Sequence, residues 1–444
     1  MTAPIVQVDT EHRRVLNAIV GAVLEAIDPG RAVERWFEEE DYGPGDAERV
    51  FVVGVGKASV AMARAVEERL GERIAGGLVV TRRGDTSGVE ELRYVEVVEA
   101  AHPVPDESCA EAGRRLLAVA DEAGPGDLVI CVISGGGSAL STLPAPTLSV
   151  EHLQRTTQLL LECGAAIGET NAVRKHLSAI AGGRLAKAIA PARHLSLILS
   201  DVIGAGVDAV ASGLTVGDST TFDDAWTVVE KYGLKERLPS AVVDHLQAGL
   251  HGEVEETLSS DAPEFRRGRA CVIGDVELAT CAAAEAAGGL GWKTAILSTT
   301  IEGEARDVAG VLVSIAREIL DHGRPFEPPI CLVAGGETTV TVTGEGRGGR
   351  NQELALAALH QLGGRRKITF ATLATDGVDG PTDAAGAVAD AATFERARRA
   401  GLDAATHLQN NDSFRFFETT GDLIVTGATG SNVNDVVVIL VSKD

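Results

Sequence analysis

Two glycine-rich turns in the last third of the chain carry charged side chains suited to phosphate chemistry. The first covers residues 344–353 and places Arg350 directly before an apolar helical pattern. The second covers residues 375–383, follows a strand-like run and contains Asp376 and Asp379. Glycine lets backbone N–H groups approach a ligand closely, and a helix N-terminus attracts an anion. Aspartates just after a strand are placed for a metal ion or a proton. We therefore expect a phosphate-handling catalytic centre.

Three further motifs lie earlier in the chain, each where an apolar strand pattern ends. Lys57 closes a Gly-Val-Gly-Lys turn, the run Ser-Gly-Gly-Gly-Ser occupies residues 134–138, and Asp201 follows the apolar residues 195–199. Open α/β sheets bind ligands beyond the carboxyl ends of their strands. The Gly-x-Gly-Lys turn alone is a weak signal, because it matches neither a Walker motif nor a full dinucleotide fingerprint. Together, these cations, glycine turns and carboxylates are the inventory that phosphoryl transfer needs.

Each of these residues also has a structural explanation. Lys57 can be a solvated turn lysine, and Arg350 can pair with Glu345 or Glu353 on the surface. Asp376 can simply form a turn, since Asp-Gly is a common turn dipeptide. A Ser-His-Asp hydrolase is disfavoured, because the order Gly-Gly-Gly-Ser is not the Gly-x-Ser-x-Gly elbow of that class.

The composition excludes several classes of protein. The chain has 444 residues, 45% of them hydrophobic and 23% charged. Its formal net charge of -24 argues against a nucleic-acid partner, because phosphate backbones select basic faces. Its 6 cysteines show no Cys-x-x-Cys spacing, so neither a zinc site nor a disulfide framework is indicated. No signal-peptide pattern and no apolar run of about 18 residues is found, so we expect a cytoplasmic protein without a membrane partner. Salt adaptation and a GC-rich genome explain the acid-rich, lysine-poor composition equally well.

Strand and helix patterns alternate along the chain, which is typical of α/β folds. A polar stretch over residues 251–268 interrupts this alternation. We therefore predict two α/β domains, residues 10–250 and residues 269–444, joined by a linker over residues 251–268.

Motifs along nearly the whole chain resemble those of the glycerate 2-kinases, the class whose C-terminal half is called the MOFRL domain. The resemblance implies two three-layer α/β domains, the first a Rossmann-like, mostly parallel sheet, with the active site in the interdomain cleft. It also implies an ATP-dependent kinase of carbohydrate metabolism that works with Mg²⁺. The product would be 2-phosphoglycerate, formed with ADP when the 2-hydroxyl of D-glycerate is phosphorylated. The motifs are VGVGKAS, AHPVPDE, SGGGSALS, NAVRKHLSAIAGGRLA, LSDVIG, ASGLTVGDSTTF, GGETTVTVTGEGRGGRNQE, ATDGVDGPTDAAGA and TGATGSNVNDV.

By position, the resemblance implies four catalytic residues. Lys57 and Arg350 match the family's active-site lysine and arginine, and we expect them to hold the glycerate carboxylate or the transferring phosphate. Asp201 and Asp376 match two aspartates of the family, of which one assists the hydroxyl or binds Mg²⁺; which one stays open. Residues expected to contact substrate or phosphate are Gly56, Ser134, Gly135, Gly136, Gly137, Ser138, Asn351 and Glu353.

Two other functions stay open on the sequence alone. An NAD(P)-dependent hydroxypyruvate reductase is disfavoured by the missing third glycine after the first strand. A non-catalytic sugar-phosphate-binding protein would use the same glycine turns. The chain also departs from the family's pattern at Ala205-Gly206, where acidic residues are common, and at Leu214, where proline is usual. The nucleotide preference, the tolerance of other 2-hydroxy acids and the oligomeric state, a homodimer included, are left open.

Overall fold

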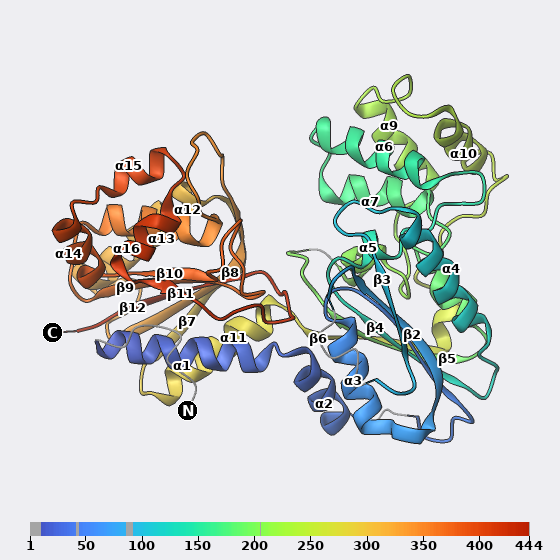
Figure 1. Cartoon of the computed structure of the whole chain (residues 1–444), viewed down its shortest axis with the longest axis horizontal. Coiled ribbons are helices and arrows are strands. Elements are labelled where there is room, and N and C mark those ends of the chain that lie inside the picture. The colour runs from blue at the N-terminus through green and yellow to red at the C-terminus, as the bar shows by residue number, and fades with distance from the viewer. Residues whose placement is uncertain (1–9, 41–43, 86–91, 205, 444) are drawn as a thin grey trace. The chain divides into compact units, whose positions relative to one another are not determined.

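The computed structural model describes residues 10–40, 44–85, 92–204 and 206–443. Its contacts divide the chain into two compact units. The first, called the N-terminal unit below, runs from Pro29 to Ile273. The second, called the C-terminal unit, consists of the first helix together with the chain from Gly274 onward. Each unit contains one six-stranded sheet with helices on both of its faces (Figure 1).

The N-terminal unit is built on a sheet of apolar strands. β1 and β4 are buried at every position, as expected of parallel strands that are covered on both faces. β1 pairs in parallel with β2 and β4, β2 pairs in parallel with β3, and β4 pairs in parallel with β5. The order β3-β2-β1-β4-β5-β6 is the Rossmann order. The strands are β1 (Val50–Val55), β2 (Ile74–Arg82), β3 (Glu96–Ala100), β4 (Leu128–Ile133), β5 (Arg193–Leu199) and β6 (Gly268–Gly274).

Side chains alternate between the two faces of this sheet, and each face has its own core. Phe51 and Val53 pack with α4 and α8, whereas Val50 and Val52 pack with α2 and α3. This alternation makes the unit a three-layer α/β sandwich. The helices of the two outer layers are α2 (Pro29–Glu39), α3 (Ser59–Leu70), α4 (Glu107–Asp121) and α8 (Arg184–Ile189).

A helical cluster extends the N-terminal unit beyond its sheet. α6, α7, α9 and α10 share one buried core and gather at one end of the unit (Figure 1). Gly182 and Gly183 have φ angles of 60° and 80° and form part of the turn that separates α7 from α8. The cluster consists of α6 (Val150–Glu162), α7 (Ile167–His176), α9 (Phe222–Lys231) and α10 (Ser240–Leu250). Shorter helices of the unit are α5 (Gly137–Leu140), η1 (Gly71–Arg73), η3 (Val207–Ser212) and η4 (Pro263–Arg267).

The C-terminal unit has a mixed sheet in the order β11-β10-β9-β12-β8-β7. β7 and β8 pair in parallel, while β12 runs antiparallel to both β8 and β9. The remaining pairs, β9 with β10 and β10 with β11, are antiparallel. As a result, β12 begins at the edge where β8 and β9 end. The strands are β7 (Lys293–Glu304), β8 (Ile330–Thr339), β9 (Ile368–Ala374), β10 (Gly386–Ala389), β11 (Leu423–Ile424) and β12 (Asp435–Val441).

Helices cover both faces of this second sheet. α1 and α11 pack on the face that carries Val333 and Val438, while α12 and α13 pack on the face that carries Leu332 and Ile439. Both units are therefore three-layer α/β sandwiches, and the first has a Rossmann-like parallel sheet, so the predicted fold class is confirmed. The helices are α1 (Glu11–Ala26), α11 (Val276–Gly289), α12 (Ala305–His322), α13 (Arg350–Leu362), α14 (Ala391–Ala400), α15 (Ala404–Gln409) and α16 (Ser413–Thr420).

The units differ from the domain boundaries that we expected from the sequence. The expected first domain, residues 10–250, began with α1, but α1 belongs to the C-terminal unit. One physical reason is that the apolar face of α1, with Leu16 and Ile19, packs in the core of that unit. A second is a buried ion-pair group, in which Nε of Arg13 lies 2.8 Å from Asp390 and Nη1 of Arg13 lies 2.7 Å from Asp422. The expected second domain, residues 269–444, included β6, which instead lies beside β5 in the first sheet.

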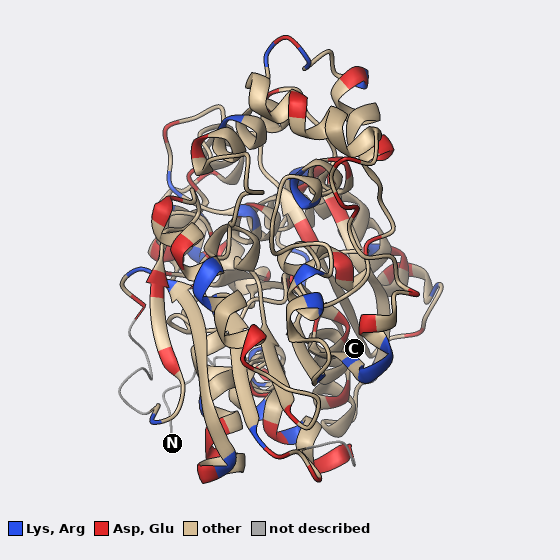
Figure 2. Ribbon diagram, turned by 90° about the vertical axis from the view of Figure 1, so that its right-hand side faces the viewer, with Lys and Arg blue, Asp and Glu red and all other residues tan. Residues whose placement is uncertain are grey.

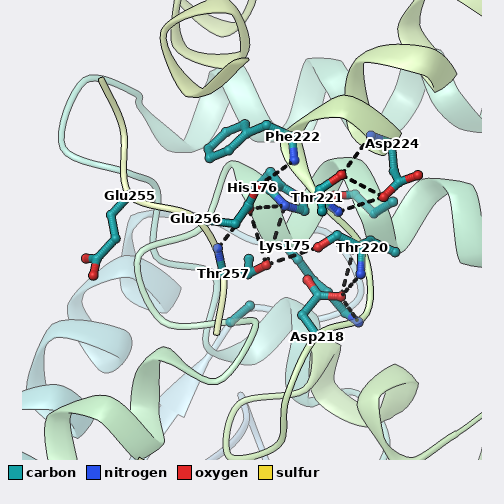
Figure 3. Close-up of polar contacts among 12 residues, drawn as sticks. Lys175, His176, Asp218, Thr220, Thr221, Phe222, Asp224, Glu255, Glu256 and Thr257 are labelled. Atoms are coloured by element: carbon teal, nitrogen blue, oxygen red, sulfur yellow. Dashed lines mark hydrogen bonds and ion pairs between the residues drawn. The ribbon is translucent and has the colours of Figure 1, made fainter. Parts of the chain in front are cut away.

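The expected linker, residues 251–268, packs on the N-terminal unit. Oε1 of Glu256 lies 2.7 Å from Nε2 of His176, and Oε2 accepts the N–H of Phe222 at 2.9 Å (Figure 3). Thr257 and Leu258 are buried against this unit, and the Leu258 N–H donates to the Gly182 carbonyl. The polar composition that suggested a linker therefore reflects side chains that bond to α7 and α9.

In the described part of the chain, acidic residues are dispersed (Figure 2). Figure 2 shows the acidic residues spread over helices, strands and loops rather than gathered on one element. A dispersed net charge of this kind promotes solubility. None of the helices in the described ranges combines the length and apolar character needed to span a bilayer.

Candidate active site

The turn between β1 and α3 holds Lys57 at the carboxyl edge of the N-terminal sheet. The backbone N–H groups of residues 56–58 all donate within the chain, so this turn does not offer the backbone phosphate cradle that its glycines suggested. Gly56 has a φ of 126°, and a Cβ there would lie 2.2 Å from Oγ of Ser134, which explains why the position needs glycine. The three donations are Gly56 N to Val80 O at 3.1 Å, Lys57 N to Gly135 O at 3.0 Å and Ala58 N to Ser134 Oγ at 3.0 Å.

The glycine turn after β4 differs, because two of its N–H groups stay open. Within the described residues, the amides of Gly135 and Gly136 donate no hydrogen bond. A Cβ on Gly135 would lie 2.1 Å from Oδ2 of Asp201, and a Cβ on Gly136 would lie 3.0 Å from Nε2 of His102 and 3.5 Å from Cγ of Lys57. The three side chains therefore surround these two glycines. Successive open amides beside a cation form a site for an anion.

Lys57 is the cation of this site. Its side chain is half-buried and forms no ion pair or hydrogen bond with any described residue. Burial lowers the pKa of His102, and the positive charges of Lys57 and Arg82 lower it further. His102 is therefore neutral at pH 7, and Lys57 carries the charge. A lysine without a carboxylate partner can meet a phosphate or carboxylate group of a substrate.

The two serines of the Ser-Gly-Gly-Gly-Ser run have different surroundings. Ser134 is buried, and its Oγ accepts the Ala58 amide, so it holds the turn after β1 in place. Gly137 is buried and begins α5. Ser138 is half-buried, and its Oγ lies 2.8 Å from Oγ of Ser212. Of the two predicted serines, Ser138 is the one placed to reach a ligand directly.

In the C-terminal unit, Arg350 lies between two carboxylates. It is the first residue of α13, and its Nη1 lies 2.7 Å from Oε1 of Glu337 at the end of β8. Its Nε and Nη2 donate to the two carboxylate oxygens of Asp435 at the start of β12, at 2.5 Å and 2.9 Å. Neither Glu345 nor Glu353, the partners considered from the sequence, pairs with it among the described residues.

Both members of the main pair are charged at neutral pH. Burial alone would lower the pKa of Arg350, but the hydrogen bonds and charge of Asp435 outweigh it and raise that pKa. Burial raises the pKa of Asp435 to about 6, against the opposing hydrogen bonds and charge of Arg350. Arg350 is thus held in a fixed orientation, with 30% of its side chain exposed for a ligand.

Asp379 caps the N-terminus of α13 by accepting hydrogen bonds from its first N–H groups. Its Oδ1 accepts the N–H of Asn351 at 3.0 Å, while its Oδ2 accepts the N–H of Gln352 at 2.8 Å and Nε2 of Gln352 at 2.9 Å. Burial raises the pKa of Asp379, whereas the hydrogen bonds from Gln352 and Asn351 lower it. The anion that we expected at this helix start is therefore a carboxylate of the chain itself. Asn351 is fully buried in the same network.

The glycines of the turn before α13 approach the chain's own backbone. A Cβ on Gly346 would lie 2.4 Å from the carbonyl oxygen of Asn410, so glycine is needed here for packing. Glu353 is also buried and lies within this packing: its Oε1 accepts from Nε of Arg306 at 2.6 Å, and its Oε2 accepts from Nδ2 of Asn411 at 3.1 Å. The contacts of Glu353 stabilise the loop, and its predicted contact with substrate stays a prediction.

Asp376 lies in the loop after β9 and is half-buried. Its Oδ1 accepts the N–H of Val378 at 3.0 Å, and its Oδ2 accepts no hydrogen bond from the described residues. Gly377, with a φ of 83°, lies against Gly427, because a Cβ would come within 1.9 Å of the Gly427 carbonyl oxygen. One oxygen of Asp376 is therefore available at the same edge of the sheet as Arg350.

The described residues contain no group of three or more His, Cys, Asp or Glu side chains that could hold a metal ion. Mg²⁺ usually binds one or two carboxylates, keeps several waters and takes its other ligands from substrate phosphates. The single open oxygen of Asp376 suits that mode of binding. The residues present thus fit a Mg²⁺ ion that arrives on a nucleotide, rather than a metal held in a protein cage.

Sequence reasoning missed the partners that orient the charged groups. Glu337 and Asp435 hold Arg350, and Asp379 caps α13, but the sequence indicated none of these contacts. A usable signal was the position of Asp435, an acidic residue at the first position of the buried strand β12. Of the two departures from the family's pattern, Ala205 lies outside the described residues, and Leu214 is buried.

Comparisons with known proteins agree with this fold over nearly the whole chain. Residues 15–247 match a family model described as a domain of unknown function, DUF4147, and residues 330–435 match the MOFRL family. A glycerate 2-kinase of Pyrococcus horikoshii is 42% identical over 439 residues, which are 97% of this chain and 98% of that protein. A protein of Agrobacterium vitis, named provisionally as a hydroxypyruvate reductase, is 40% identical over 98% of this chain and 95% of its own. The crystal structure of a glycerate kinase from Thermotoga maritima superposes with a TM-score of 0.88 at 39% identity, covering 96% of this chain and 99% of that one. The chain belongs to the glycerate 2-kinase family, with a MOFRL domain in its C-terminal half.

Proposed function

We propose that this protein transfers the γ-phosphoryl group of ATP to the 2-hydroxyl of D-glycerate, giving 2-phosphoglycerate and ADP. The observation that carries the proposal is the anion site of the N-terminal unit, where the unpaired Lys57 lies beside the open amides of Gly135 and Gly136. Catalysis of phosphoryl transfer consists mainly of such positioned cations and N–H groups, which stabilise the phosphate oxygens. Support also comes from the glycerate kinase names of full-length relatives.

In this reaction, the bond between the γ-phosphorus and the bridging oxygen of ADP breaks while a bond to the glycerate O2 forms. Lys57 and Arg350 hold the transferring phosphate or the glycerate carboxylate. Asp201 and Asp376 are the two candidates to accept the hydroxyl proton. The open Oδ2 of Asp376 and the position of Asp201 against Gly135 support both roles.

The nucleotide would bring Mg²⁺, which neutralises phosphate oxygens when bound. Asp201 and Asp376 are the residues that would supply a carboxylate to it. We place the enzyme in the cytoplasm and in carbohydrate metabolism, in keeping with its acidic composition and the small, soluble substrates proposed.

A coupled ADP-release assay with D-glycerate, ATP and Mg²⁺, followed by phosphorus NMR of the product, tests the proposal. We expect ADP release that depends on glycerate and a 2-phosphoglycerate signal. A 3-phosphoglycerate signal would keep the kinase and refute the site of transfer. No ADP release at either low or high salt would refute the proposed activity.

Two variants test the anion site in the same assay. Lys57→Met should lower kcat by about 100-fold or more, because it removes charge that stabilises the developing phosphate charge. Gly135→Ala should also lower kcat. Its new Cβ would lie 2.1 Å from Oδ2 of Asp201, which is too close, so the Asp201 carboxylate would have to move. Gly168→Ala is the matched control, because a Cβ there would meet nothing within 4 Å. Rates close to the parent for both site variants would remove this turn from the active site.

The reductase function has less support. A dinucleotide would place its pyrophosphate at the turn between the first strand and the following helix. In this chain, the N–H groups of Gly56, Lys57 and Ala58 in that turn already donate within the protein. Nicotinamide oxidation with hydroxypyruvate would nevertheless be measured in parallel, and a rate above that of glycerate phosphorylation would favour the reductase.

A further inference from the structure

The N-terminal unit contains a cavity of about 560 Å³ next to the anion site. It is lined by α5, α6, α7, η3 and the loop of residues 103–105. Because Ser138 belongs both to the glycine turn and to the cavity wall, the two features are continuous. The volume lies in the range of small-molecule sites, roughly 300–1,000 Å³. This is large for a three-carbon hydroxy acid alone.

Most of the cavity wall is apolar. Leu153 and Leu161 of α6 line it, and so do Leu177 and Leu214. Leu161 is 68% exposed and lies where the cavity opens to the surface. Such a wall suits the flat, apolar faces of a nucleobase and offers little to glycerate, whose surface is mostly oxygen.

Arg174 supplies a positive charge to this wall. It is one of three consecutive basic residues at the end of α7, and the other two have partners inside the chain. Lys175 lies 3.2 Å from Asp218, and His176 lies 2.7 Å from Glu256 (Figure 3). Within the described ranges, the guanidinium of Arg174 has no ion pair and no hydrogen bond.

The environment of Arg174 is suited to binding an anion. Burial lowers its pKa, and no carboxylate among the described residues offsets that effect. Removing a guanidinium from water without a partner is costly, so proteins rarely keep one unless it binds something. On the same wall, Ala211 and Ser212 have φ angles of 48° and 57°, a conformation that non-glycine residues rarely adopt and that clusters at ligand sites.

We propose that this cavity binds the nucleotide donor, with its apolar wall against the base and ribose and with Arg174 on a phosphate. The proposal rests on the proposed function, because it takes the donor to be an adenine nucleotide. It assigns the donor to the N-terminal unit and leaves the smaller acceptor to the rest of the active site.

The test is binding of ADP alone, measured by isothermal titration calorimetry in the absence of any hydroxy acid. Arg174→Met should weaken ADP binding by about 10- to 100-fold, the usual effect of losing a hydrogen bond to a charged group. Thr157→Phe, which puts a ring into the cavity from α6, should weaken it by a similar factor. Arg155→Met is the matched control. It also removes one arginine charge from this group of helices, but Arg155, on α6, does not line the cavity. We expect it to stay within about 2-fold of the parent.

Folding of each variant is checked by its circular dichroism spectrum and its thermal midpoint. If one of the two cavity variants does not fold, the other still tests the inference. ADP affinities within about 2-fold of the parent for both Arg174→Met and Thr157→Phe would overturn the inference. So would a higher KM for D-glycerate at unchanged ADP affinity, because the cavity would then bind the acceptor. If ADP binding responds as expected but no glycerate is phosphorylated, the proposed acceptor fails and the nucleotide site stands.

Discussion

Asp379→Ala should destabilise the C-terminal unit strongly, because Asp379 accepts three short hydrogen bonds at the buried start of α13. The donors are two backbone N–H groups and the side-chain amide of Gln352, at 3.0, 2.8 and 2.9 Å. A buried donor left without an acceptor costs about 1–3 kcal/mol. The loss is partly offset, since the variant no longer buries a carboxylate whose pKa is raised by burial. We therefore expect the free energy of unfolding to fall by about 3–5 kcal/mol.

The assay must report on this unit alone, because a protein of two units has no single free energy of unfolding. Of the three tryptophans, Trp292 belongs to the C-terminal unit, while Trp36 and Trp226 belong to the N-terminal unit. Urea unfolding followed by fluorescence in a Trp36→Phe/Trp226→Phe background therefore follows the relevant transition. Asp376→Ala is the matched control from the same loop, and it should cost about 1 kcal/mol because Asp376 accepts one N–H at a half-buried position.

Equal losses for Asp379→Ala and Asp376→Ala would refute this reasoning. They would mean that water or another group satisfies the first turn of α13 when Asp379 is absent. In that case the helix start would be open to an external anion, and the interpretation of this turn as a phosphate site would regain its basis.

Two further predictions concern buried charges of the C-terminal unit. Arg13→Met should lower the free energy of unfolding of this unit by about 3–5 kcal/mol in the same fluorescence assay, because it leaves Asp390 buried without its arginine and Asp422 with Arg396 alone. A loss below about 1 kcal/mol would show that this ion-pair group does not stabilise the unit. Burial raises the pKa of Asp435 to about 6 in the folded state. Between about pH 6 and pH 4 the folded state therefore holds a proton on Asp435, whereas in the unfolded state this carboxyl is mostly ionised, so lowering the pH stabilises the folded state. The free energy of unfolding of the parent should therefore rise by about 2 kcal/mol relative to that of Asp435→Asn as the pH falls from 7 to 4, and a constant or shrinking difference would contradict the raised pKa.

Much of the fold follows from sequence patterns, because the central strands are long apolar runs. β1, β4 and β12 are buried at every residue, and the apolar residues 195–199 noted in the sequence lie within β5, Arg193–Leu199. The pattern did not predict β10, since its residues Gly386–Ala389 follow a glycine- and aspartate-rich turn and contain one β-branched side chain. The domain boundaries were less predictable, because the position of α1 depends on the buried pairs of Arg13, which are distant in sequence.

The candidate site was predictable where strands are parallel and less so where they are not. β1 and β4 are parallel neighbours, so Lys57 and Gly135 had to meet at the edge where both strands end. In the second sheet β12 is antiparallel, and it therefore brings its first residue, Asp435, to the edge where β8 and β9 end. A hydrophobic run does not reveal the direction of its strand, so the acidic residue at the start of β12 was visible in the sequence but its pairing with Arg350 was not.

Glycine-rich turns serve two different physical purposes in this chain. The two can be distinguished by whether the backbone N–H groups of the turn already donate hydrogen bonds within the protein. In the turn before α13, Gly346 allows the backbone to approach Asn410, and Asp379 takes the helix N–H groups. In the turn after β4, the amides of Gly135 and Gly136 are left open, beside a lysine that has no carboxylate partner among the described residues. A turn whose N–H groups already donate within the protein stabilises the fold. A turn whose N–H groups have no acceptor and lie beside an unpaired cation is suited to bind an anion. By this criterion, we propose that the phosphate chemistry takes place at Lys57 and Gly135–Gly136, and that the glycine-rich turn before α13 mainly positions Arg350.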